Sequence, residues 1–205
     1  MTVRPVPRLH VIGPLITDPA DYPAIAVAAV KGGCDAVHVR IPGGATDDLL
    51  ALARTLRDLI GDVALIVNDR LDIALLAGAA GVQLGERSFS VADARQLLPA
   101  GALIGRSVHD LDGARAALAD GADYLLAGHV FDTPSKQGVP GRGLDWLAEL
   151  ASVVPIPVIA LGGITIERVP GVLEAGAHGV ALGRELLRST DPAASARRVA
   201  EILFQ

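Results

Sequence analysis

The sequence has little cysteine and few aromatic residues. Its single cysteine, Cys34, excludes a disulfide within the chain and any metal cluster held by several cysteines, and it is typical of a protein in a reducing compartment. Aromatic residues make up only 3% of a chain that is 51% hydrophobic, so its core must consist mainly of Ala, Val, Leu and Ile. These short side chains suit close contact between helices and a parallel sheet.

The sequence also lacks a block of basic residues and a long apolar run. A net charge of −5 with no Lys and Arg cluster gives no electrostatic footprint for nucleic acid. Every apolar run ends well short of the roughly 18 residues that a membrane span requires, and the start of the chain lacks the apolar core of a secretory signal. We therefore predict a cytoplasmic protein that binds neither nucleic acid nor membrane, with one domain over residues 1–205.

A hidden repeat organises the chain. Four segments share a Gly, a small residue, two variable positions and an apolar run, and they span residues 33–39, 78–84, 121–127 and 176–182. Further apolar segments lie at residues 9–16, 63–68, 102–107 and 157–163. All eight are predicted strands.

Helix signals separate these strands. Apolar residues recur with helical spacing from Thr46 until Gly61, and Ser90, Asp110 and Asp191 are predicted to cap three further helices. The expected seventh helix contains Pro170-Gly171 and should be short or kinked.

Eight strands alternating with helices predict an α/β fold, a single-domain (β/α)₈ TIM barrel. An open doubly wound sheet is the alternative, but the first strand is not followed by the Gly-x-Gly-x-x-Gly turn of that fold. Barrel enzymes collect their chemistry at the C-terminal ends of the strands. Candidate residues follow seven of the predicted strands: His38, Arg40, Asn68, Asp69, Gln83, Glu86, Ser107, His109, His129, Lys136, Gly162-Gly163 and Gly183-Arg184.

Two glycine-containing turns indicate a phosphate site. Gly162-Gly163 follows the seventh strand, and Gly183-Arg184 follows the eighth and opens a short helix. Backbone N–H groups of such turns bind a phosphate dianion, although a tight strand-to-helix turn has the same sequence.

His129 is the strongest candidate for acid/base chemistry. It follows a strand end and begins the longest polar loop, and an imidazole moves protons readily at neutral pH. A merely hydrogen-bonded histidine is the alternative, and this is the role we expect for His10 and His178. The triplet 68–70, Asn-Asp-Arg, is compatible with a polar substrate group, a metal ion or a helix cap.

Seven motifs carry a family resemblance over nearly the whole chain. They are VHVR (37–40), IVNDRLDIAL (66–75), GVQLGERSFS (81–90), IGRSVH (104–109), DYLLAGHVFDTPSKQGVPGRG (123–143), PVIALGGIT (157–165) and GAHGVAL (176–182). Together they resemble the thiamine phosphate synthase superfamily, and within it the thiazole tautomerase branch most closely. This resemblance implies a (β/α)₈ barrel that works in thiamine biosynthesis.

The synthase branch couples a pyrimidine diphosphate to a thiazole phosphate with Mg²⁺. The chain is similar to it at six positions: Arg40, Asn68, Asp69, Ser107, Thr133 and Lys136. It departs where that branch has Gln-x-Arg-x-Lys, since residues 38–42 read His-Val-Arg-Ile-Pro. It departs again where the branch has an acidic metal ligand, since residues 85–88 read Gly-Glu-Arg-Ser, although Glu86 is a possible substitute.

The tautomerase branch has a histidine at the position of His129, and the resemblance assigns proton transfer to it. The implied reaction is that of an isomerase, the aromatisation of a carboxylated thiazole phosphate tautomer, which requires no metal or other cofactor. The expected substrate contacts are the phosphate at Gly162, Gly163, Gly183 and Arg184, the carboxylate at Arg40 and Lys136, the ring at Asn68 and Ser107, and an anionic group at Thr133 and Ser135.

Two alternatives remain open at this point. One is a thiamine phosphate synthase with altered metal and diphosphate ligands. The other is a non-catalytic barrel that binds a thiazole phosphate and acts as a regulator or accessory protein. A homodimer is a further expectation for any of the three.

Overall fold

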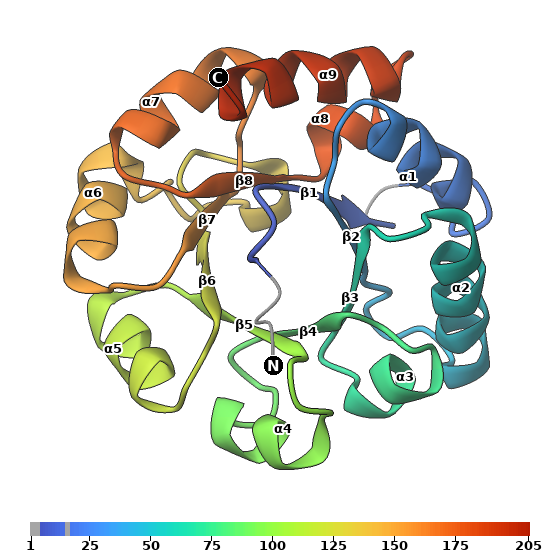
Figure 1. Ribbon diagram of the computed structural model, residues 1–205. Helices are drawn as coiled ribbons and strands as arrows, with labels where there is room; N and C mark the ends of the chain where they lie inside the picture. The colour runs from blue at the N-terminus through green and yellow to red at the C-terminus, as the bar shows by residue number, and fades with distance from the viewer. Residues whose placement is uncertain (1–4, 15–16) are drawn as a thin grey trace.

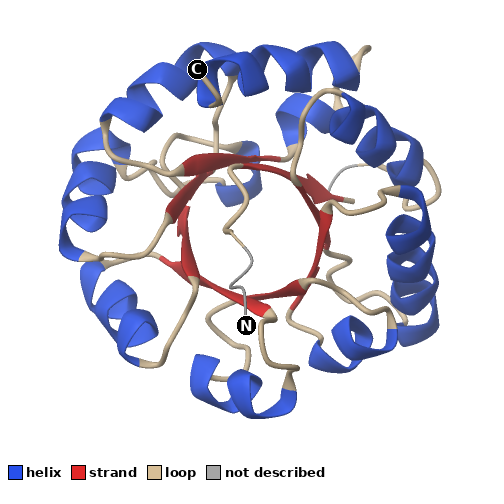
Figure 2. Ribbon diagram, viewed as in Figure 1, coloured by secondary structure: helices blue, strands red, loops and turns tan. Residues whose placement is uncertain are grey.

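The strands close into a ring that the helices surround. A computed structural model describes residues 5–14 and 17–205, with eight parallel strands inside and helices outside (Figure 1, Figure 2). The strands lie in chain order, and β1 closes the ring by pairing with β8. This confirms the (β/α)₈ TIM barrel and excludes the open sheet.

The eight predicted strands are all present. They are β1 (Leu9–Gly13), β2 (Ala36–Val39), β3 (Ala64–Asn68), β4 (Gly81–Leu84), β5 (Leu103–Val108), β6 (Tyr124–Gly128), β7 (Val158–Leu161) and β8 (Gly179–Leu182). The prediction for β1 ran on to residue 16, and positions 15 and 16 lie outside the described residues.

The helices follow the strands. They are α1 (Tyr22–Lys31), α2 (Thr46–Leu59), α3 (Leu71–Leu76), α4 (Val91–Leu97), α5 (Leu111–Ala119), α6 (Gly143–Val153), α7 (Val169–Glu174), α8 (Arg184–Leu187) and α9 (Pro192–Leu203). Two 3₁₀ turns, η1 (Pro134–Lys136) and η2 (Ile166–Arg168), precede α6 and α7.

The three predicted caps are confirmed. Ser90, Asp110 and Asp191 each accept a hydrogen bond from the backbone N–H three residues ahead, at α4, α5 and α9. The helix α7 is short as expected, because Pro170 lies in its first turn and η2 occupies the preceding residues.

Two apolar layers lie on the two sides of the strands. Alternate residues such as Val11, Val37 and Val82 face outward and pack against the helices, and Cys34 is buried in this layer. Inward-facing residues form a smaller cluster: Ile12, Ala36, Ala64, Ile66, Leu103, Tyr124, Leu126, Ile159 and Ala181. The ring is therefore a packed core rather than a pore.

The N-terminal segment covers one end of this core. Val6 packs against the inner cluster, and the backbone N–H groups of Arg8 and Leu9 donate to the carboxylate of Asp35. Figure 1 shows this segment crossing the centre of the ring. The C-terminal ends of all eight strands lie at the opposite end of the barrel. This end is the one at which a ligand can bind.

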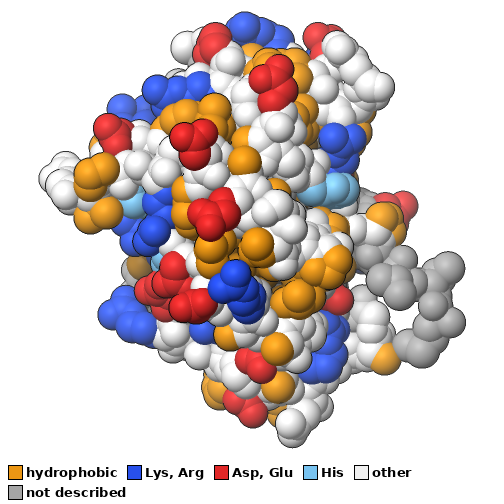
Figure 3. Space-filling model, turned by 90° about the vertical axis from the view of Figure 1, so that its left-hand side faces the viewer, with side chains coloured by type: hydrophobic (Ala, Val, Ile, Leu, Met, Phe, Trp, Pro, Cys, Tyr) orange, Lys and Arg blue, Asp and Glu red, His pale blue; other side chains and the backbone are white. Residues whose placement is uncertain are grey.

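Acidic and basic side chains intermingle on the face that carries α5, α6 and α7 (Figure 3). This face therefore shows no concentration of positive charge of the kind that nucleic acid requires. Among residues 5–14 and 17–205, no helix is long and apolar enough to cross a membrane.

The cap of α5 can be tested with a neighbouring control. We expect Asp110→Ala to lower the free energy of unfolding by about 1 kcal/mol, because it removes the acceptor of the Gly113 N–H. Asp112→Ala should change it by less than about 0.5 kcal/mol, since that side chain is 96% exposed and makes its ion pair with the exposed Arg115. Urea unfolding of both variants measures the difference, and equal losses would contradict the cap assignment.

Candidate active site at the barrel mouth

The predicted site residues lie at one end of the barrel. Arg40 follows β2, Asn68 ends β3, Ser107 lies near the end of β5, and His129 follows β6. Gly162-Gly163 follows β7, and Gly183-Arg184 follows β8. Because the strands are parallel and the ring is closed, these positions surround one mouth.

His129 occupies an inserted position between β6 and β7. Leu125 pairs with Val158, and its N–H donates to the carbonyl one residue earlier, that of Pro157. Beyond Gly128, the carbonyl of Leu161 receives its bond from Val130 rather than from His129. The hydrogen-bonded pairing thus resumes one residue late, so His129 is the extra residue of a β-bulge. Such bulges often lie next to active sites, where they reorient a side chain.

The imidazole of His129 is buried under the loop that follows β6. His129 is only 7% exposed, and its Nε2 lies 3.0 Å from the carbonyl oxygen of Val139. A carbonyl only accepts hydrogen bonds, so Nε2 carries the proton. The neutral ring therefore has its lone pair on Nδ1.

The turn after β7 must be glycine to accommodate His129. Gly162 and Gly163 have φ angles of +99° and +64°, values that disfavour any side chain. A Cβ on Gly162 would lie 2.3 Å from the Cβ of His129, and one on Gly163 would lie 2.5 Å from the carbonyl oxygen of Asp132. The two strand ends are therefore fitted to each other.

The turn after β8 contains an unpaired guanidinium nitrogen. Arg184 begins α8, and its Nε atom is buried without a hydrogen-bond partner among the described residues. An unsatisfied buried donor is costly, and an anion would satisfy it. This observation agrees with the phosphate prediction for Gly183 and Arg184.

The remaining predicted ligand residues are more exposed. Arg40 is exposed, and its backbone N–H donates to Gly13 at 2.8 Å. Ser135 and Lys136 are exposed in η1, whose first turn is capped by the half-buried Thr133. Thr133, Ser135 and Lys136 lie on the loop between β6 and α6. They can contact a ligand only where this loop covers the mouth.

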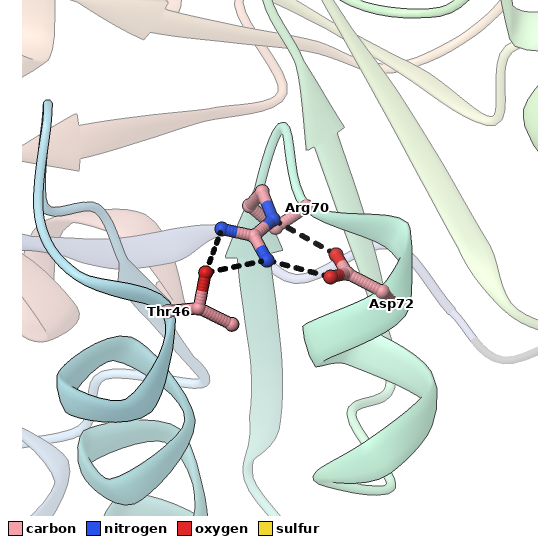
Figure 4. Close-up of polar contacts among 3 residues, drawn as sticks. All are labelled: Thr46, Arg70 and Asp72. Atoms are coloured by element: carbon pink, nitrogen blue, oxygen red, sulfur yellow. Dashed lines mark hydrogen bonds and ion pairs between the residues drawn. The ribbon is translucent and has the colours of Figure 1, made fainter.

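The triplet 68–70 divides into three separate roles. Asn68 contacts the buried His38 with 3.2 Å between His38 Nδ1 and the side-chain amide. Arg70 turns away from the mouth and binds Asp72 and the hydroxyl of Thr46, which joins the start of α3 to that of α2 (Figure 4). The arginine holds the pKa of Asp72 below its usual value.

Asp69 accepts hydrogen bonds from the N–H of Gly85 and the hydroxyl of Ser88. Glu86, the possible substitute ligand, is 67% exposed and lies 3.6 Å from the imidazole of His109. No group of three or more His, Cys, Asp or Glu side chains suited to a metal ion occurs among the described residues. At this turn the carboxylate of Asp69 faces the hydroxyl of Ser88 rather than a second carboxylate, where the synthase branch has an acidic ligand.

His109 precedes Asp110, the cap of α5, and takes no part in capping this helix. Its Nδ1 instead donates to the carbonyl oxygen of Gly128 at 2.6 Å. The strand-end position of His109 was visible in the sequence, whereas its contact with Gly128 depends on how β5 and β6 meet.

Two buried histidines lie beneath Asn68 inside the barrel. Nδ1 of His10 lies 2.8 Å from Nε2 of His38, and Nε2 of His10 lies 3.0 Å from the carbonyl oxygen of Pro7. Both residues are fully buried, and burial lowers the pKa of each imidazole, with His10 lowering that of His38 further. His10 is structural, as expected, while His38 points inward and supports the mouth.

Gln83 supports a second mouth residue in the same way. Its side-chain amide nitrogen donates to the hydroxyl of Ser107 at 3.0 Å, and Gln83 is fully buried. The hydroxyl hydrogen of Ser107 is therefore available to a ligand.

Comparison with known proteins agrees with the fold and the motifs. The family description "Thiamine monophosphate synthase" matches residues 10–186. The thiamine-phosphate synthase of Anaeromyxobacter dehalogenans is 45% identical over 189 residues, which cover 90% of this chain and 84% of that protein. That of Methanoculleus marisnigri is 42% identical over 179 residues, covering 84% and 83%.

Among solved structures, the thiamine phosphate pyrophosphorylase from Pyrococcus furiosus superposes with a TM-score of 0.86 at 32% identity, covering 96% of this chain and 95% of that one. A 3-hexulose-6-phosphate synthase at 20% identity, with a TM-score of 0.78, shares the fold. The fold and its strand-end site define a TIM-barrel enzyme. The chain belongs to the thiamine monophosphate synthase family, whose enzymes serve thiamine biosynthesis.

Substitutions at two glycines distinguish a steric clash with His129 from the cost of a strained backbone alone. Gly162→Ala and Gly101→Ala both place a side chain at positive φ, at a cost of about 1–2 kcal/mol each. Only Gly162 has a close neighbour, so its variant should lose roughly 1–3 kcal/mol more. Urea unfolding gives the free energies, and the ¹⁵N shifts of His129 should move only in Gly162→Ala. Equal losses and unmoved shifts would contradict the fit.

Proposed function

We propose that the protein is a thiazole tautomerase, an isomerase of thiamine biosynthesis. The observation that carries the proposal is His129, which a bulge inserts at the mouth with Nε2 bonded to the carbonyl oxygen of Val139. In a neutral ring this bond leaves the lone pair of Nδ1 for a substrate. The required chemistry is a proton shift, and a positioned imidazole accelerates such a step by about 10²–10⁴-fold.

The proton transfer follows from this arrangement. Nδ1 of His129 removes the proton from the ring carbon that bears the carboxylate, and the electron pair enters the conjugated ring system. The carbonyl of Val139 stabilises the resulting imidazolium through its Nε2–H. Nδ1 then returns the proton to the former exocyclic double-bond carbon, which leaves an aromatic thiazole and a neutral histidine.

The other mouth residues orient the substrate. The N–H groups of the turns at Gly162-Gly163 and Gly183, with the guanidinium of Arg184, bind its phosphate. Arg40 and Lys136 bind the carboxylate, and Thr133 and Ser135 lie beside Lys136 on the covering loop. Asn68 and Ser107 contact the ring. Because proton transfer alone is required, no cofactor enters this reaction.

Thiamine phosphate synthase is the second candidate, and the names of the relatives favour it over the tautomerase. The chain is similar to the synthase branch at Arg40, Asn68, Asp69, Ser107, Thr133 and Lys136. Pro42 stands where the synthase pattern has lysine, and residues 85–88 offer Asp69 a serine rather than a second acidic ligand. These departures remove one cationic and one acidic group of the synthase pattern, and they place the synthase second.

His129→Gln tests the tautomerase. We expect kcat for conversion of the carboxythiazole phosphate tautomer, followed by its ultraviolet absorbance, to fall about 10²–10⁴-fold while substrate binding is retained. The control is Asp112→Asn, whose side chain is 96% exposed on α5 and should leave kcat unchanged. Unchanged turnover in His129→Gln would refute the mechanism.

A coupling assay separates the two candidate functions. With the pyrimidine diphosphate, the thiazole phosphate and Mg²⁺, we expect no thiamine phosphate above background. Product formation that Asp69→Asn abolishes would establish the synthase instead. Tight binding of the thiazole phosphate without turnover in either assay would identify a non-catalytic regulatory barrel.

A further inference from the structure

The contacts of the two buried histidines form a continuous chain from one end of the barrel to the other. It runs from the carbonyl of Pro7 through His10 and His38 to the side-chain amide of Asn68, with contacts of 3.0, 2.8 and 3.2 Å. Pro7 and Asn68 lie at opposite ends of the ring. The direction of each hydrogen bond can therefore be followed from the closed end to the mouth.

The direction is fixed at Pro7. Its carbonyl can only accept, so Nε2 of His10 carries a proton, and Nδ1 of a neutral His10 is an acceptor. Nε2 of His38 must then donate to His10. A neutral His38 consequently has its lone pair on Nδ1, the atom that faces Asn68.

This lone pair needs a donor, and the amide of Asn68 offers one only through its nitrogen. In the structure the amide oxygen occupies the position nearest His38, so the contact joins two acceptors unless the histidine pair holds an additional proton. The amide oxygen and nitrogen are nearly identical in shape, and the hydrogen-bond network decides between them. A half-turn of the amide satisfies every bond without burying a charge.

The surroundings of the pair favour the neutral form. Both imidazoles are fully buried, and the other ring that lies against His10 is the uncharged Tyr124. The charged or titratable groups that act on His10 are Asp35 and His178, and the Asp35 carboxylate already accepts from two backbone N–H groups. No carboxylate contacts either imidazole among the hydrogen bonds of the described residues.

We infer that the His10–His38 pair acts as a positioning device that turns the amide nitrogen of Asn68 inward and presents its oxygen to the mouth. Asn68 is therefore an acceptor subsite, which takes an N–H or O–H group of a ligand and disfavours an anion. In the structure the amide nitrogen of Gln83 donates to the oxygen of Ser107, an arrangement that leaves the hydroxyl hydrogen of Ser107 for a ligand acceptor. A carboxylate or phosphate is thereby directed away from Asn68, toward the basic residues of the rim.

Histidine tautomers measured by NMR test this inference without any assay of turnover. In protein labelled with ¹⁵N-histidine, which has five histidines, we expect His10 and His38 to be neutral with protonated Nε2 and unprotonated Nδ1 at pH 7. His38→Gln assigns the His38 signals. A protonated Nδ1 on His38 would overturn the inference, because the amide oxygen of Asn68 would then face inward.

Two substitutions at Asn68 provide a matched pair. An ionised Asp at this position has only acceptors, so Asn68→Asp should make the histidine pair bind one additional proton at pH 7 and protonate Nδ1 of His38. Asn68→Ala removes the contact and should leave both rings neutral. A pair that is neutral in Asn68→Asp, while the ¹³C shift of the introduced carboxyl shows it to be ionised, would show that no hydrogen-bond chain connects the mouth to the histidines, and would also overturn the inference. These results stand whether or not the tautomerase assay succeeds.

Discussion

Closure of the parallel ring is the constraint on which the rest of the structure depends. Each strand bonds to both neighbours, and the pairing of β1 with β8 leaves no free edge. Closure forces alternate side chains into the interior, where space limits their size and where water does not satisfy polar groups. It also brings residues more than a hundred positions apart, such as Arg40 and Arg184, to a single mouth.

The interior meets this constraint with more polar groups than a stable core requires. His10, His38 and Gln83 are fully buried, and each contacts a polar atom nearer the mouth or the closed end. An apolar residue at any of these positions would avoid the cost of burying a polar group. Their presence is explained by what they support, since two of the three hold Asn68 and Ser107 in one orientation.

Local signals made much of the fold predictable. The glycine-led repeat located four strands and the apolar segments between its copies located the other four. Ser90, Asp110 and Asp191 marked helix starts because capping depends on a few neighbouring residues. The short α7 followed from Pro170 for the same reason. Placement of the site residues at the strand ends then followed from the topology of the barrel.

The contacts within the site were not predictable, because they depend on register between strands. The bulge at His129 exists only relative to β7, and the inward orientation of His38 could not be distinguished from the outward one before its pairing with β1 was known. Arg70 was a candidate at the mouth, yet Asp72 and Thr46 hold it on the outer surface. The choice between two chemistries within one family likewise depends on single side chains, which names of relatives do not resolve.

The N-terminal segment acquires a second significance from its contacts. Residues around Pro7 close the N-terminal end of the barrel. Through His10 and His38, the carbonyl of Pro7 sets the orientation of the Asn68 amide at the mouth. A substitution that displaces the backbone at Pro7 would then alter which ligands the distant opening accepts. The bottom of a TIM barrel is usually associated with stability alone, but here it has a direct bonded route to selectivity.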